Sequence, residues 1–184
     1  MATSKYIALL RGINVGGNHL IKMTNLVGYF EKMGFQKVRT YIQSGNVLFR
    51  TTQTSPVTLA HNVEAALAEA VGYHSVVVVK SAAELELIVK SAPRDFGADP
   101  TTYRYNVIFL RDPLTSTEAL PHFSAREGVD QVTPGPGVIY FSNLMAEATK
   151  SRLSRIVGSP IYKDITIRNW NTTTKLLALA TADD

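Results

Sequence analysis

The stretch Lys5-Tyr-Ile-Ala-Leu-Leu-Arg11, followed directly by Gly12-Ile-Asn-Val-Gly-Gly-Asn18, decides the fold. Its first half is a continuous apolar run of strand length that ends in Arg-Gly, a pattern typical of a central strand. Its second half is a glycine-rich loop, where glycine allows backbone conformations that other residues avoid. We therefore expect a buried strand that carries a polar loop at its end, with a helix after the loop.

The segments around this strand alternate between strand and helix patterns. After the loop the sequence predicts a helix with Thr24 as its candidate N-cap and Gly34 at its end. It then predicts strands 37–43 and 46–50 joined by Ser44-Gly45, a helix from Pro56 to Gly72, a strand 75–80 and a helix 81–90. Ser81 and Glu84 have the spacing of a capping box for the last of these helices. The order of the first half is therefore βαββαβ, followed by one more helix.

The second half repeats this order after a connector, residues 91–100, that contains Pro93, Gly97 and Pro100. The predicted segments are a strand 105–112, a helix 116–123, strands 130–133 and 138–142, a helix 146–157, a strand 164–168 and a helix 172–180. This pattern predicts an α+β fold of two tandem ferredoxin-like (βαββαβ) halves, each followed by an extra helix. The halves would span residues 1–92 and 101–184, either as separate modules or as one compact unit.

Composition excludes several classes of protein. The 184 residues include no cysteine, which excludes disulfides, thiolate metal sites and thiol nucleophiles. The first apolar run is interrupted by Arg11 and is too short for a signal peptide, and no run approaches the ~20 residues of a membrane helix. We therefore expect a soluble cytoplasmic protein that does not interact with a membrane.

Basic residues concentrate towards the two ends of the chain. Residues 1–50 contain seven Lys and Arg against Glu31 alone, and residues 150–175 contain six against Asp164 alone. Residues 51–149 contain six basic and eleven acidic side chains. Two basic ends around an acidic middle would suit an anionic ligand if the ends meet in space. The alternative is that these charges are scattered over a solvated surface.

The glycine loop resembles a phosphate-binding loop only in part. Gly12 and Gly17 have the G-x-x-x-x-G spacing, but Asn18-His19 occupies the position of the Lys-Ser/Thr pair that such a loop requires. Nucleotide hydrolysis is therefore a poor interpretation. Backbone N–H groups of the glycines, together with Arg11 and Lys22, could still surround an anion. The alternative is a loop that needs glycine only for its backbone conformation.

Two further polar strings could line a site. Gln43-Ser-Gly-Asn46 places amides and a hydroxyl on a tight turn, although turns use these residues for backbone reasons too. Near the other end, Ile165 to Lys175 places Arg168 and Asn169 at a strand end, and Asn171 or Thr172 could cap the next helix. Arg168 could bind a carboxylate or phosphate with two hydrogen bonds. Trp170 could stack on a flat ligand or pack beneath the helix.

These strings resemble those of one bacterial protein family. The matching segments are Leu9 to Gly17, Ile21-Lys-Met23, Arg39 to Val47, Thr166 to Asn171 and Lys175-Leu176, and they are similar to the family of domain of unknown function 1697 over essentially the whole chain. The resemblance implies a two-part α+β protein but no activity, substrate or catalytic residues. Relatives often have Gly-Gly-Lys in the loop, where this chain has Asn18.

We expect the protein to bind an anionic or phosphate-bearing small ligand in a basic cleft built from both chain ends. The residues expected to contact it are Arg11, Asn14, Gly16, Gly17, Asn18, Lys22, Gln43, Ser44, Asn46, Arg168, Asn169, Trp170, Asn171 and Lys175. No cofactor or metal is expected, because the four histidines lack metal-ligand spacing.

Three alternatives remain. The first is a nucleic-acid-binding protein, although strands 46–50 and 138–142 lack the RNA-recognition signature. The second is an enzyme of unassigned reaction; Ser44 lacks the G-x-S-x-G context of a nucleophile. The third is a protein-interaction module. The sequence leaves the oligomeric state open.

Overall fold

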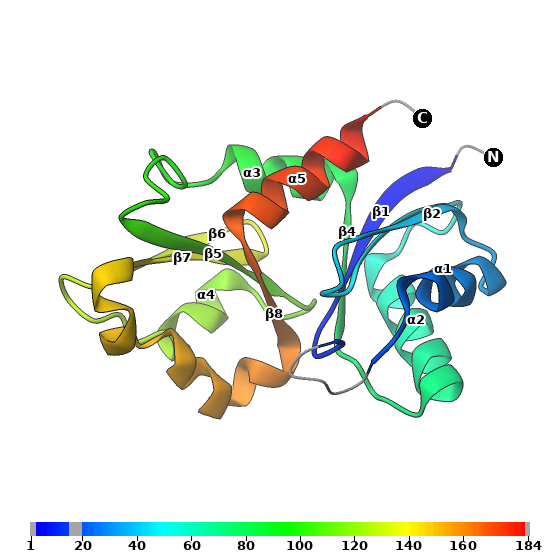
Figure 1. The fold of residues 1–184 in the computed structure, drawn as a ribbon, viewed down its shortest axis with the longest axis horizontal. Helices are drawn as coiled ribbons and strands as arrows, with labels where there is room; N and C mark the ends of the chain where they lie inside the picture. The colour runs from blue at the N-terminus through cyan, green and yellow to red at the C-terminus, as the bar shows by residue number, and fades with distance from the viewer. Residues whose placement is uncertain (1–2, 15–19, 183–184) are drawn as a thin grey trace. The chain divides into compact units, whose positions relative to one another are not determined.

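The computed structural model describes residues 3–14 and 20–182, which form a mixed α+β fold with two four-stranded antiparallel sheets (Figure 1). The chain divides into two compact units. The first unit contains Met1–Leu85 and Ala178–Asp184, and the second contains Glu86–Leu177. Among the described residues, no helix is long and apolar enough to cross a membrane.

The first sheet has the strand order β2-β3-β1-β4. Its elements are β1 (Ser4–Leu10), α1 (Met23–Lys32), β2 (Gln36–Tyr41), β3 (Asn46–Thr51), α2 (Pro56–Val71) and β4 (Val77–Ser81), and α3 (Ala82–Lys90) follows. The helices α1 and α2 cover one face of this sheet (Figure 1). Alternate strand residues such as Ala8 and Phe49 meet Phe30 and Val63 there in a buried core, because the side chains of a strand alternate between its two faces.

Local sequence signals explain most helix ends in this unit. Pro56 begins α2, where the Ser55 hydroxyl accepts a hydrogen bond from the Thr58 N–H, and Gly72 ends it with φ of 65°. The predicted capping box before α3 is confirmed, since Glu84 accepts from the Ser81 N–H at 2.7 Å and Ser81 Oγ accepts from the Glu84 N–H at 3.2 Å.

The predicted N-cap of the first helix was wrong. The helix α1 begins at Met23, so Thr24 lies inside it, and the residue before the helix is Lys22, which makes no capping hydrogen bond with its side chain. The Asn14 side chain holds the backbone of Ile21 just before the helix. This tertiary contact positions the chain ahead of α1 without a local cap.

The second sheet has the order β6-β7-β5-β8. Its elements are β5 (Tyr103–Leu110), α4 (Ser116–Ala119), the 3-10 helix η1 (Leu120–His122), β6 (Asp130–Gly135), β7 (Val138–Leu144), the 3-10 helices η2 (Met145–Lys150), η3 (Leu153–Gly158) and η4 (Pro160–Asp164), β8 (Ile165–Asn169) and α5 (Trp170–Thr181). One face of the sheet, which includes Ile108, Ile139 and Phe141, packs in a core with Ile156 and Ile161.

The predicted helix over residues 146–157 was wrong, because this region consists of short 3-10 turns. Ser151 is extended, with φ of −60° and ψ of 142°. The Arg152 N–H donates to the Asp130 carboxylate at 2.9 Å, so it is not used in an α-helical hydrogen bond. Asp130 is buried and also accepts from the Arg126 N–H. A buried carboxylate therefore decides the backbone path here.

Candidate functional site

In the glycine-rich loop after β1, the described polar groups mainly hold the backbone in place. Asn14 donates hydrogen bonds of 3.0 Å to the carbonyls of Ile21 and Gln43, and its side-chain oxygen accepts from the Ile21 N–H at 2.8 Å. The Arg11 carbonyl accepts from the Ser75 hydroxyl at 2.8 Å. The predicted contacts Gly16, Gly17 and Asn18 lie outside the described residues.

The amide turn between β2 and β3 is structural in the same way. Asn46 is fully buried and donates to the Tyr41 carbonyl and to the Ser44 hydroxyl, both at 3.1 Å. Gly45 has φ of 80°, and a Cβ there would lie 2.9 Å from atoms of Leu10. Only glycine fits this close approach. Gln43 and Lys22 are exposed near this turn, as is the apolar Ile42, and Arg11 is half-buried.

Arg168 is held inside the second unit. Its side chain is 8% exposed and donates to the Thr166 hydroxyl at 2.9 Å and to the Ile167 carbonyl at 2.8 Å. Burial lowers the pKa of this guanidinium to about 10. Arg11 and Arg168 belong to different units, so the hypothesis that both contact one ligand stays a prediction.

Asn169 and Trp170 prepare the start of α5. The Asn169 side chain accepts a hydrogen bond from the Thr172 N–H at 2.7 Å and so caps the helix. The predicted cap, Asn171 or Thr172, was wrong, because both residues lie inside α5. The Trp170 ring packs against the connector, with its centroid 5.1 Å from that of Phe96. A Cβ at Gly97 would lie only 2.2 Å from this ring. The tryptophan therefore anchors the connector to the helix.

A groove of about 190 Å³ opens where α5 begins. We call it the α5 groove; its lining residues are Gly97, Pro100, Tyr103, Arg104, Tyr105, Met145, Asn169, Trp170 and Asn171. The groove brings together three residues singled out from the sequence, namely Asn169, Trp170 and Asn171. Lys175 is exposed farther along the same helix and is not part of the lining.

Sequence reasoning missed Arg104 and its two tyrosine neighbours. The strand β8 pairs with β5 only as far as Asn169 opposite Asn106. Residues 103–105 therefore continue past the end of β8, beside the first turn of α5. The exposed Arg104 side chain reaches the groove from this overhang. The alternation Tyr103-Arg104-Tyr105 was the available signal, because it places both rings on one face of the strand.

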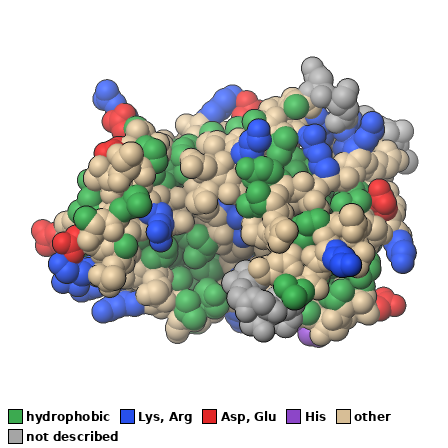
Figure 2. Space-filling view, in the orientation of Figure 1, with side chains coloured by type: hydrophobic (Ala, Val, Ile, Leu, Met, Phe, Trp, Pro, Cys, Tyr) green, Lys and Arg blue, Asp and Glu red, His purple; other side chains and the backbone are tan. Residues whose placement is uncertain are grey.

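A cluster of basic residues on the first sheet has a different use. Lys5, Lys37, Arg39 and Arg50 line a small hollow beside Ala180, and Figure 2 shows Lys and Arg side chains gathered over this part of the first unit. Lys5 donates to the Ala182 carbonyl at 2.7 Å, and Arg39 donates to the Leu179 carbonyl. Lys5 and Arg39, two of the basic residues within 1–50, therefore bind the carbonyl end of α5, where the helix dipole favours positive charge.

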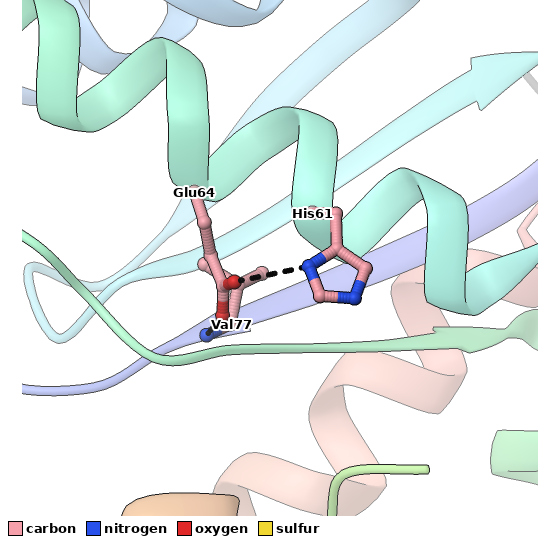
Figure 3. Close-up of polar contacts among 3 residues, drawn as sticks. All are labelled: His61, Glu64 and Val77. Atoms are coloured by element: carbon pink, nitrogen blue, oxygen red, sulfur yellow. Dashed lines mark hydrogen bonds and ion pairs between the residues drawn. The ribbon is translucent and has the colours of Figure 1, made fainter. Parts of the chain in front are cut away.

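The histidines do not form a metal site in the described part of the chain, where no group of three or more potential ligands occurs. His61 lies 3.7 Å from Glu64 one turn along α2, and Figure 3 shows the pair on the helix surface. Glu64 also accepts from the Val77 N–H at 2.9 Å, which ties α2 to β4. This pair is a contact within one helix at the protein surface, since the His61 side chain is 62% exposed.

Carboxyl groups with shifted pKa values also have structural partners. Hydrogen bonds from Thr101 and Thr102 lower the pKa of Asp99, and hydrogen bonds from Thr115 lower that of Glu118. Both carboxylates hold local turns or caps. An enzymatic reading would need an acid or base with a shifted pKa in the α5 groove, and none of the described groups with a resolved shift lines it.

The fold and the groove define an α+β protein with two four-stranded antiparallel sheets and a polar, partly aromatic groove in one of its units. Residues 3–140 match a family described as "Protein of unknown function (DUF1697)". The match covers most of the chain, which therefore belongs to this family, and the resemblance noted from the sequence is confirmed.

The fold is similar to that of a solved bacterial protein structure. It is described as the structure of conserved bacterial protein SP0830 from Streptococcus pneumoniae, with a TM-score of 0.85 and 24% identity. The similarity covers 98% of this chain and 100% of that one. At this level of identity it concerns the fold alone. No curated protein matches the chain.

Proposed function

We propose that this protein binds an anionic small ligand, one that carries a carboxylate or a phosphate, in the α5 groove. The observation that carries the proposal is the meeting of Arg104 with Asn169 and Asn171 in one groove of one unit. No acidic side chain is among the groove's lining residues. Arg104 is therefore the source of charge, and the asparagines supply amide groups.

The chemistry of these groups suits an oxyanion. A guanidinium offers parallel N–H groups that match the two oxygens of a carboxylate or a phosphate. Asn169 uses its side-chain oxygen to cap α5, which leaves its amide NH2 available as a donor. The first backbone N–H groups of α5 add the positive end of the helix dipole. All of these donors come from elements that the fold holds in place.

We also infer that the chain arose by duplication of a ferredoxin-like unit, with halves near residues 1–92 and 101–184. Support comes from the two sheets, whose orders β2-β3-β1-β4 and β6-β7-β5-β8 correspond strand for strand. This order is that of the split βαβ pattern. The second copy has replaced one of its helices by the 3-10 turns η2 to η4.

Isothermal titration with inorganic phosphate and with acetate tests the binding proposal. We expect a saturable heat in the wild-type protein that disappears in Arg104→Ala, while Arg155→Ala binds as the wild type does. Arg155 is a matched control, because it is an exposed arginine of the same unit outside the groove. A ligand at ~100 times its dissociation constant would also stabilise the fold by about 2.7 kcal/mol. Equal binding by both variants would reject the groove as the site.

Nucleic-acid binding is the second candidate, and the basic cluster on the first sheet favours it. Lys37 and Arg50 would contact phosphates there, beside the cations that hold the end of α5. Such binding weakens steeply with salt, because it releases counterions. We expect Lys37→Glu to abolish binding of short RNA or DNA at low salt while Arg104→Ala does not. The converse result would reject this candidate.

A further inference from the structure

A second cavity lies in the same unit as the α5 groove and shares Tyr103 and Tyr105 with it. We call it the tyrosine pocket; its volume is about 260 Å³. Phe96, Tyr103, Tyr105 and Tyr140 form its aromatic walls, and Gln131, Thr133 and Ser142 form its polar floor. A cavity of this size is near the lower end of the range for small-molecule sites, so it holds one or two rings.

The strand register explains why the floor is built this way. Gln131, Ser142 and Tyr105 are consecutive cross-strand partners on β6, β7 and β5, so their side chains point to one face of the sheet. The connector passes over this face, and Phe96 meets Tyr105 edge to face with ring centroids 5.0 Å apart. The tyrosine pocket is the space between the connector and the sheet.

Hydrogen bonds to residues outside the lining hold the walls of the pocket. The Tyr140 hydroxyl donates to the Ile88 carbonyl at 2.5 Å, which sets the position of that ring. In the connector, the Asp99 carboxylate accepts from the Thr101 hydroxyl at 2.7 Å and from the Thr102 N–H at 3.1 Å. The pocket is therefore preorganised, and a ligand would not have to order it.

The Ser142 hydroxyl is the feature of the floor that points to a ligand. Ser142 lines the cavity, and the residue as a whole is only 4% exposed. Its hydroxyl can both donate and accept a hydrogen bond, so it offers a polar contact to a ligand in the cavity. Gln131 beside it is exposed and offers both a donor and an acceptor.

We infer that the tyrosine pocket takes a flat aromatic or heteroaromatic ring, and that the ligand of the α5 groove is an anion that carries this ring. Aromatic walls favour stacking and edge contacts with a ring. Asp95, Asp99 and Arg94 also line the tyrosine pocket, and Arg94 lies 3.8 Å from Asp95. The lining therefore has one more carboxylate than cation, whereas the α5 groove has Arg104 and no acid in its lining, so the negative group belongs beside Arg104. The inference rests on the proposed function, and it narrows the ligand to compounds such as nucleoside monophosphates and aromatic acids.

Titration calorimetry with four probes tests the inference. Adenosine 5′-monophosphate carries both a heteroaromatic ring and a phosphate. Ribose 5-phosphate lacks the ring, and adenosine lacks the phosphate. Phenyl phosphate carries a phosphate and an aromatic ring that has no polar edge atoms. We expect adenosine 5′-monophosphate to bind roughly tenfold or more tightly than ribose 5-phosphate, the size of effect that stacking of one base produces. If phenyl phosphate gains as much affinity over ribose 5-phosphate as adenosine 5′-monophosphate does, the ligand class is a simple aromatic acid. If phenyl phosphate gains less, the ligand class is a nucleotide.

Two variants locate the ring. Gln131→Leu and Ser142→Val should remove most of the advantage of adenosine 5′-monophosphate over ribose 5-phosphate, while Arg104→Ala weakens both phosphates. Gln36→Leu is the control, an exposed strand glutamine in the other unit. The exposed Gln131 keeps the test meaningful if Ser142→Val fails to fold.

The results separate the two proposals. If ring-bearing and ring-free phosphates bind equally, the ring inference is wrong and anion binding stands. If adenosine binds in a manner that depends on Gln131 while no phosphate binds better, the pocket stands and the anion proposal is wrong. If none of the four probes binds, both are wrong.

Discussion

Tyr140 combines a buried ring with a short hydrogen bond to the Ile88 carbonyl, and burial raises the pKa of its hydroxyl to about 12. A group whose pKa is raised by folding stabilises the native state fully below its unfolded pKa, near 10, and loses that contribution as pH rises towards 12. We predict that urea midpoints of the wild type fall more between pH 10 and 12 than those of Tyr140→Phe. Parallel pH profiles of the two proteins would contradict this.

Gly97 is required where the connector meets the Trp170 ring. Its φ is 89°, and an added Cβ would lie 2.2 Å from the ring. We predict that Gly97→Ala destabilises the protein by about 1–3 kcal/mol, through backbone strain and displacement of the tryptophan. Gly158→Ala is the matched control, because open space surrounds a Cβ at that position, and it should change the free energy of unfolding by less than about 0.5 kcal/mol. Urea denaturation measures both, and equal effects would disprove the explanation.

At the scale of elements, the last turn of α5 depends on cations from the first sheet. Arg39 donates to the Leu179 carbonyl, and Lys5 donates to the Ala182 carbonyl. We predict that Arg39→Ala lowers the free energy of unfolding by about 0.5–1 kcal/mol at low ionic strength, and less in 1 M salt, because salt screens the exposed charge. Lys37→Ala is the control, a neighbouring cation of the same cluster for which no such bond is found among the described residues. Thermal melts of both variants at two salt concentrations measure this effect. A loss of stability in Arg39→Ala that does not depend on salt would contradict the prediction.

Most elements were predictable because their signals are local. The apolar runs of β1 and β5, proline at the start of α2 and the Ser81–Glu84 capping box all act within a few residues. The region 146–157 was not predictable, because its backbone is held by Asp130, a residue distant in sequence. The start of α1 was missed because Lys22, the residue before the helix, makes no side-chain cap that a sequence signal could reveal.

At the scale of the whole molecule, each unit has its own buried core and its own four-stranded sheet. The central strands are β3 and β1 in the first sheet, and β7 and β5 in the second. We predict that the amides slowest to exchange with solvent fall into two sets, one in each pair of central strands, because these amides are both bonded and buried. Hydrogen exchange followed by mass spectrometry measures this. Strong protection confined to one sheet would contradict the description of two cores.

The α+β class, most strand and helix positions and the polar strings could be read from the amino-acid sequence, because propensity, periodicity and turn chemistry act over short stretches. Only the tertiary structure decided which polar side chains are available to a ligand. Arg168 was expected to contact the anion, yet it is buried and bound to its own strand. Arg104 joins Asn169 because β5 extends past the end of β8, a register that depends on the pairing of strands far apart in the chain.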